Sequence, residues 1–166
     1  MHKIKTTLLA IMLSLFAFQA QALTVGEAGP VFDLPGDGAA MVKLSSYKGK
    51  VIYVDFWASW CGPCKQSFPW LNEMQAKYGN KGFQIVALNV DANTTDAKNF
   101  LNTNPAKFTI AYDAKGVTPK AYGIKGMPSS VLLDADGKVL FQHTGFRESD
   151  RAQLEKTIQQ VLGQTK

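Results

Sequence analysis

The sequence has very few cysteine and histidine side chains, which hold most zinc sites: two cysteines and two histidines among 166 residues. The cysteines, Cys61 and Cys64, are separated by two residues, and the histidines are His2 and His143. A zinc site needs about four Cys, His or carboxylate ligands, so a metal site is disfavoured. A structural disulfide across so short a loop would add only about 2 kcal/mol to stability, which also disfavours a purely structural pair.

Clusters of basic residues are missing as well. The net charge is +5, but lysine and arginine are spread along the chain without a basic run. Nucleic-acid binding depends on clustered Lys and Arg, so we expect no nucleic-acid partner. Long apolar runs are also few, and residues 6–18 are too short to span a bilayer, which needs about 20 apolar residues.

The first 22 residues nevertheless have the pattern of a secretory signal peptide. Two lysines give a basic start, residues 6–18 are almost wholly apolar, and Ala20-Gln21-Ala22 is a small-x-small cleavage site. We expect residues 1–22 to be a signal peptide and residues 23–166 to form one domain. Retention of the apolar run as an N-terminal anchor is the alternative. Export would place the cysteines in an oxidising compartment, here the bacterial periplasm.

The two cysteines lie at a predicted strand-to-helix turn. Residues 51–57 are an apolar run typical of a buried strand, and helical spacing of apolar residues predicts a helix over about 62–78. Pro63 falls where a helix accepts proline. The start of a helix stabilises a thiolate, so the pKa of Cys61 should lie in the range of roughly 3.5 to 7.5. Cys64, one turn further in, should stay a thiol longer, which gives an attacking and a resolving sulfur.

The rest of the chain has the pattern of an α/β domain. Residues 31–34 and 41–44 flank Pro35-Gly36-Asp37-Gly38 and predict a β-hairpin. Residues 83–90 predict a second central strand, parallel to residues 51–57 through a right-handed crossover. The further expected elements are a helix over 94–101 capped by Thr95, a strand over 109–112, a helix over 118–122, hairpin strands over 129–134 and 138–143, and a final helix capped by Ser149.

Two segments resemble the thioredoxin superfamily. Residues 54–65, Val-Asp-Phe-Trp-Ala-Ser-Trp-Cys-Gly-Pro-Cys-Lys, resemble its active-site signature, and Pro69 matches the proline that kinks its active-site helix. Residues 122–129 resemble the segment that holds its cis-proline, and residues 32–50 resemble the exported TlpA/ResA branch. The resemblance implies an α/β thioredoxin fold, with a central mixed β-sheet flanked by helices, an N-terminal β-hairpin and a central insertion.

The resemblance also implies which residues meet a client protein. It implies a cis bond before Pro128, and it places Met127 and Pro128 against the cysteine turn. A proline there cannot complete a sheet ladder, which leaves neighbouring backbone groups free to pair with an incoming peptide. Exposed apolar groups around Cys61 would dock the partner. The expected client-binding residues are Trp60, Gly62, Pro63, Met127, Pro128 and Gly145.

Asp55 is the one charged residue in an otherwise apolar strand. Burial of a carboxylate is costly and raises its pKa until it can hold a proton. The matching residue of thioredoxin accepts the proton of the second cysteine through water, so the resemblance implies the same role toward Cys64. The alternative is an outward-facing Asp on an edge strand. Two positions depart from the relatives: Ala87 replaces a frequent lysine, and Ser67 replaces a frequent acidic residue.

These features predict a thiol–disulfide oxidoreductase. We expect it to reduce disulfides of exported clients, such as apocytochromes c or copper-site proteins, with no cofactor beyond the Cys61–Cys64 pair. A membrane dithiol donor of the DsbD or CcdA kind would reduce it again, and we expect a monomer. The alternatives are a disulfide donor or isomerase, and a non-catalytic binding module on the same scaffold. A peroxidase is disfavoured because residues 54–61 lack the Pro-x-x-x-Thr-x-x-Cys pattern.

Overall fold

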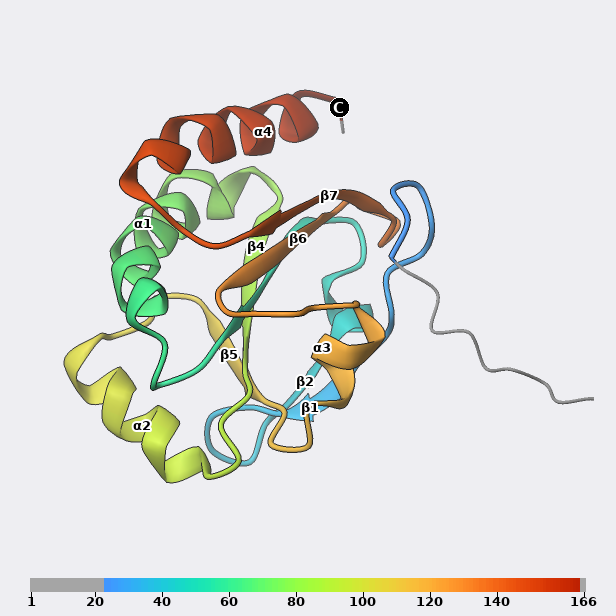
Figure 1. Cartoon of the computed structure of the whole chain (residues 1–166). Helices are drawn as coiled ribbons and strands as arrows, with labels where there is room; N and C mark the ends of the chain where they lie inside the picture. Colours follow the sequence, from blue (N-terminus) through green and yellow to red (C-terminus); the bar gives the residue numbers. More distant parts are fainter. Residues whose placement is uncertain (1–22, 165–166) are drawn as a thin grey trace, which may run out of the picture.

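The apolar run at residues 51–57 forms the central strand of a five-stranded sheet in the computed structural model, which describes residues 23–164 (Figure 1). The expected signal peptide lies outside the described residues. The strand order is β5-β4-β3-β6-β7, with β3, β4 and β5 parallel and β6 antiparallel to both its neighbours. The strands are β3 (Val51–Trp57), β4 (Phe83–Asn89), β5 (Thr109–Tyr112), β6 (Ser129–Leu133) and β7 (Val139–Thr144).

The expected α/β thioredoxin fold is therefore confirmed. The N-terminal hairpin pairs β1 (Asp33–Pro35) with β2 (Met41–Lys43), antiparallel. Between β4 and β6, where the resemblance predicts an insertion, the chain adds β5 to one edge of the sheet and contributes two helices. The helices are α1 (Gly62–Tyr78), α2 (Thr94–Thr103), α3 (Val117–Ala121) and α4 (Arg151–Gln164), with short 3-10 turns η1 (Leu44–Tyr47), η2 (Gly79–Lys81) and η3 (Glu148–Asp150).

Alternation along β3 divides the core into two layers. Successive side chains of a strand point to opposite faces of its sheet. Tyr53 belongs to a buried cluster that includes residues of α1 and α4, whereas Val54 belongs to a second cluster that includes Val42 of the N-terminal hairpin and Tyr122 after α3. Asp55 follows the odd-numbered positions, so the strand directs its carboxyl group toward α1.

Two predicted helix caps are wrong. The N-cap of α2 is Asn93, whose side chain accepts a hydrogen bond from the Thr95 N–H at 3.0 Å. Asn and Thr side chains can both cap a helix. Asn93 is the cap because it directly precedes the first turn of α2, whereas Thr95 lies inside that turn. Ser149 does not begin the last helix directly but lies inside η3, where the Asp150 carboxylate accepts from the Arg147 N–H at 3.0 Å.

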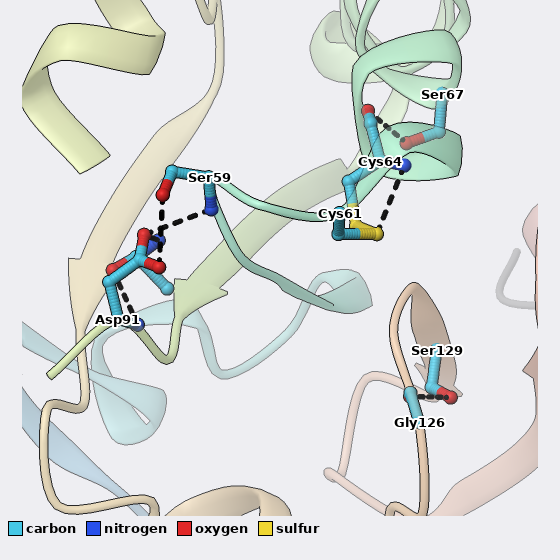
Figure 2. Close-up of a disulfide and its surroundings, with 8 residues drawn as sticks. Ser59, Cys61, Cys64, Ser67, Asp91, Gly126 and Ser129 are labelled. Atoms are coloured by element: carbon cyan, nitrogen blue, oxygen red, sulfur yellow. Dashed lines mark hydrogen bonds between the residues drawn. A yellow bond between two sulfur atoms is a disulfide. The ribbon is translucent and has the colours of Figure 1, made fainter. Parts of the chain in front are cut away.

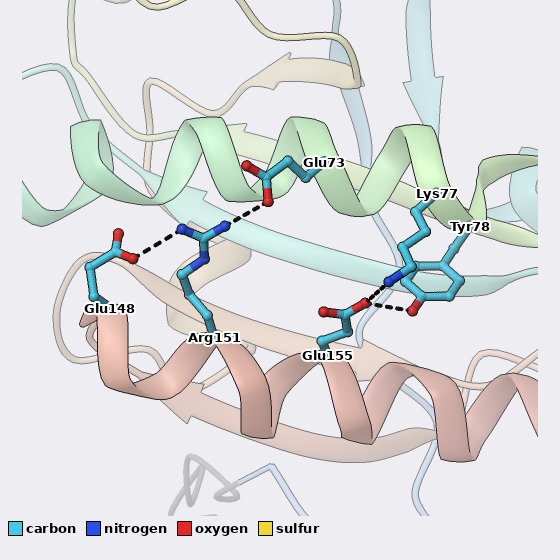
Figure 3. A network of polar contacts seen from close by, with 6 residues as sticks. All are labelled: Glu73, Lys77, Tyr78, Glu148, Arg151 and Glu155. Carbon is cyan, nitrogen blue, oxygen red and sulfur yellow. Dashed lines mark hydrogen bonds and ion pairs between the residues drawn. The ribbon is translucent and has the colours of Figure 1, made fainter.

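The last helix is attached to the active-site helix by a polar network at the rim of the core (Figure 3). Arg151 of α4 pairs with Glu73 of α1 at 2.6 Å. One turn along, the Tyr78 hydroxyl donates to Glu155 at 2.7 Å and accepts from the Gln159 side chain at 2.8 Å. These contacts supplement the apolar packing of α4 and fix its position beside α1.

We expect Tyr78→Phe to lower the free energy of unfolding by about 1 kcal/mol, because the ring stays packed while two hydrogen bonds are lost. Urea unfolding of the oxidised protein measures this. Tyr47→Phe is the matched control: its hydroxyl makes one long hydrogen bond, 3.4 Å to Thr109, so a smaller loss is expected. Equal losses in the two variants would contradict the role of the Tyr78 network.

Candidate active site

The two cysteines form a disulfide at the start of α1, with Cα atoms 5.3 Å apart (Figure 2). Cys61 is the N-cap of α1, and its sulfur accepts a hydrogen bond from the Cys64 N–H at 3.2 Å. Cys61 keeps 5% of its surface exposed, whereas Cys64 keeps none. The two sulfurs are therefore inequivalent, as the motif predicts: one lies at the helix start within reach of the surface, and the other lies inside the protein.

A buried acid that the sequence analysis missed holds the turn before Cys61. Asp91 accepts hydrogen bonds from the Ser59 N–H at 3.0 Å, the Ser59 hydroxyl at 3.1 Å and the Asn89 side chain at 2.8 Å (Figure 2). Parallel strands end at the same edge of a sheet, so residues that follow β4 meet those that follow β3. The polar Asn-Val-Asp sequence at the end of β4 was the available signal.

The segment before β6 contains the expected cis bond, between Met127 and Pro128. The Ser129 hydroxyl donates to the Gly126 carbonyl at 2.8 Å, and the Gly145 N–H donates to the Pro128 carbonyl at 2.8 Å. Among the described residues, none forms a hydrogen bond with the backbone of Met127. This backbone is therefore available for pairing with an extended peptide.

An open groove of about 420 Å³ lies between the cysteine turn and the cis-proline segment. Trp60 forms part of its lining and is 72% exposed, a large fraction for an aromatic side chain. The structure divides the expected client-binding residues into three places. Trp60 and Met127 line the groove, Pro128 and Gly145 line a small buried cavity, and Gly62 and Pro63 are exposed in the first turn of α1.

Asp55 lies in the interior, on the central strand of the sheet, so the edge-strand alternative is wrong. Its Oδ2 atom has no hydrogen-bond partner among the described residues, and burial raises its pKa well above the usual value. Asp55 lines a cavity of about 10 Å³, enough for roughly one water molecule. The same cavity is lined by Ser67 and by Trp70, whose indole N–H also has no partner in the described chain.

The two departures from the relatives leave this interior without a compensating charge. Ala87 is the β4 register partner of Asp55 and is fully buried. Ser67 is buried in α1, and its hydroxyl donates to the Cys64 carbonyl at 3.0 Å. Neither side chain carries a charge, so desolvation alone sets the direction of the Asp55 pKa shift.

A disulfide at the start of a helix, a cis-proline segment beside it and a thioredoxin fold together define a thiol–disulfide oxidoreductase, which exchanges dithiols and disulfides with client proteins. Comparisons with known proteins agree. The Redoxin family model matches residues 24–158, and the chain belongs to this family, in its ResA/TlpA-like branch.

Named relatives support the same assignment. The chain is 34% identical over 141 residues to the thiol-disulfide oxidoreductase ResA of Bacillus thuringiensis, covering 85% of this chain and 80% of that protein. It is 30% identical over 125 residues to ResA of Bacillus subtilis, covering 75% of this chain and 70% of that protein. A crystal structure assigned as a thiol:disulfide interchange protein DsbE from Chlorobium tepidum is 58% identical, with a TM-score of 0.83 over 85% of this chain and 99% of that chain.

Residues 23–164 contain neither a cluster of metal-binding side chains nor a membrane-spanning helix. Within that range, no three His, Cys, Asp or Glu side chains gather in a way that could hold a metal ion. None of the helices described there is long and apolar enough to cross a membrane.

Proposed function

We propose that this protein is a periplasmic reductase of disulfides in exported client proteins. The observation that carries the proposal is the inequivalence of its two sulfurs. Cys61 keeps a small exposed area at the helix start, next in sequence to the exposed Trp60, whereas Cys64 is fully buried one helical turn away. An attacking sulfur must be accessible, while a resolving sulfur must be protected from competing clients.

The reaction proceeds in two exchanges. The Cys61 thiolate attacks one sulfur of the client disulfide, which forms a mixed disulfide and releases the other client sulfur as a thiolate. The Cys64 thiolate then attacks the Cys61 sulfur, closes the Cys61–Cys64 disulfide and releases the second client thiolate. Two electrons pass from the protein to the client, and each released thiolate takes up a proton. The proposal needs no prosthetic group.

Asp55 is proposed to take the proton from Cys64 before the second exchange. Its support is a buried carboxyl group with a raised pKa in a cavity that also reaches Ser67, whose hydroxyl is bonded to the Cys64 carbonyl. A carboxyl whose pKa is raised toward that of a thiol is well matched to exchange a proton with it. One water molecule in the cavity would carry the proton between them.

The client is proposed to bind in an extended conformation across the cis-proline segment. The unpaired Met127 backbone supports one strand-like pairing. The exposed Trp60, with Met127, supplies apolar contact surface on the groove side. Gly62 and Pro63 are exposed in the first turn of α1, directly after Cys61 in the sequence.

We propose that residues 1–22 direct export of the protein, and export determines which partner proteins it meets. A dithiol in an oxidising compartment must be reduced again after each turnover, so we propose a membrane dithiol donor of the DsbD or CcdA kind.

Clients would include apocytochromes c or copper-site proteins, and the enzyme would act as a monomer. Mass measurement of the protein in separated periplasmic and cytoplasmic fractions tests the export step: a periplasmic chain that starts at Leu23 is expected, and a full-length chain found in the cytoplasm alone would contradict it.

We expect the Cys61–Cys64 couple to have a reduction potential close to the roughly −270 mV of thioredoxin. Equilibration of the protein without residues 1–22 in dithiothreitol and glutathione buffers measures it, and reduction of insulin by dithiothreitol should be accelerated. A potential near about −120 mV, as in strong oxidants, would contradict the reductase and indicate a disulfide donor. Insulin reduction that is no faster than with dithiothreitol alone would contradict the exchange activity itself.

A further inference from the structure

The groove beside the cysteine turn has an apolar floor and a charged rim. Trp60, Val90, Pro119, Ile124 and Met127 give it apolar surface. Lys120 of α3 and Lys125 of the following loop also line it, and both are exposed. Apolar and cationic groups therefore line the same space, which begins at Trp60, the residue directly before Cys61.

The lysines that line this groove form no ion pair in the described part of the chain. Residues 114–127 contain three lysines and no acidic residue. Two acids adjoin the groove in the sequence, Asp91 directly after the lining residue Val90 and Asp113 as the last acid before Lys120, and both are buried. Asp91 accepts from Ser59 and Asn89, and Asp113 accepts from the backbone N–H groups of Val117 and Thr118. None of the ion pairs among the described residues includes Lys120 or Lys125.

We propose that this groove selects clients whose cysteine is flanked by acidic side chains, with carboxylates at Lys120 and Lys125 and an apolar side chain against Trp60. The inference rests on the proposed function and specifies its substrate class. Complementary charge at the rim of an interface mainly raises the rate of encounter and excludes partners of the wrong sign. The apolar floor supplies affinity that does not depend on charge.

The test compares peptides that contain one intramolecular disulfide and differ only in two residues beside one cysteine, which are Glu, Gln or Lys. Oxidation of the reduced protein by each peptide is followed as loss of protein thiols at low salt. Each rate is divided by the rate of the same peptide with dithiothreitol, because flanking charges alter the reactivity of the peptide itself. The Glu peptide should react about three to ten times faster than the Gln peptide, and the Lys peptide slower, since an exposed ion pair contributes about 0.2–1 kcal/mol.

Two double variants locate the effect. In Lys120→Gln/Lys125→Gln, the ratio of the Glu to the Gln peptide should fall to within about twofold. Lys98→Gln/Lys156→Gln removes the same charge from exposed lysines outside the groove, on α2 and α4, and should keep the ratio. The wild-type ratio should also fall as salt is raised toward about 1 M, where charges are screened beyond roughly 3 Å.

The outcomes separate this inference from the proposed function. Hydroxyethyl disulfide is small and uncharged, so its reduction by the wild-type protein reports thiol exchange without the groove. If it is reduced while the three peptides react alike, the charge selection is overturned and the exchange activity stands. A preference that survives in Lys120→Gln/Lys125→Gln also overturns the inference. If hydroxyethyl disulfide is not reduced, the exchange function itself fails.

Discussion

Replacing Cys61 by serine is expected to abolish disulfide reduction, with a loss of at least roughly three orders of magnitude in the rate. A serine hydroxyl is hardly ionised near neutral pH and cannot form a mixed disulfide, so the first exchange has no nucleophile. Removal of the nucleophile from other enzymes lowers their rates by this amount or more. Cys64 cannot take over, because it is fully buried. Insulin reduction and the reaction with hydroxyethyl disulfide both measure the loss.

Cys64→Ser provides the matched control and gives a different expected result. Cys61 remains at the start of α1 and still attacks, but the second exchange cannot occur. The variant should therefore accumulate a mixed disulfide with its client, visible as a dithiothreitol-sensitive band on a non-reducing gel. If Cys61→Ser trapped clients and Cys64→Ser did not, the assignment of attacking and resolving sulfur would have to be reversed.

The local sequence was sufficient for the cysteine turn and for most strands and helices, whereas the thioredoxin fold was implied by the resemblance. The central strand is a run of apolar residues that is buried along its whole length, and α1 begins and ends at the residues that its spacing predicts. The cis bond at Pro128 could not come from local chemistry, since only about 5–6% of X-Pro bonds are cis. It came from the resemblance of the surrounding segment, and the structure bears it out.

Contacts between residues that are far apart in the sequence were not predicted. Asp91 accepts a hydrogen bond from Ser59, which is 32 residues away in the sequence. Trp70 of α1 lines the same cavity as Asp55 of β3. The lysines of the groove look like ordinary surface lysines in the sequence. Their significance depends on which acids are near them in space, and the sequence alone does not show that Asp91 and Asp113 are buried and already bonded.

Asp55→Asn is expected to stabilise the oxidised protein, and to do so more as the pH rises. Burial holds the pKa of Asp55 above its value in the unfolded chain, about 3.9. Below that unfolded pKa, the carboxyl is neutral in both states and costs nothing. Above it the unfolded chain ionises more readily, so stability falls by about 1.4 kcal/mol for each pH unit up to the folded pKa. Asparagine cannot ionise and escapes this loss.

Urea unfolding of both proteins at several pH values between 4 and 8 measures the difference. Asp91→Asn is the matched control: Asp91 is also buried, but its carboxylate accepts three hydrogen bonds. The same substitution there should cost about 1–3 kcal/mol, because a bonded acceptor is lost. A difference between wild type and Asp55→Asn that stays constant with pH would contradict the raised pKa.

The same variant separates the stability of Asp55 from its proposed role with Cys64. If Asp55 accepts the Cys64 proton, Asp55→Asn should slow resolution of the mixed disulfide by roughly a hundredfold near neutral pH, at the lower end of the range for general acid–base catalysis. Attack by Cys61 should be much less affected, because its thiolate is stabilised at the start of α1. Stopped-flow measurement of the two exchanges distinguishes them. Equal slowing of both would indicate a general structural effect, whereas a stabilised variant that resolves slowly would show that the protein keeps a destabilising buried acid for its chemistry.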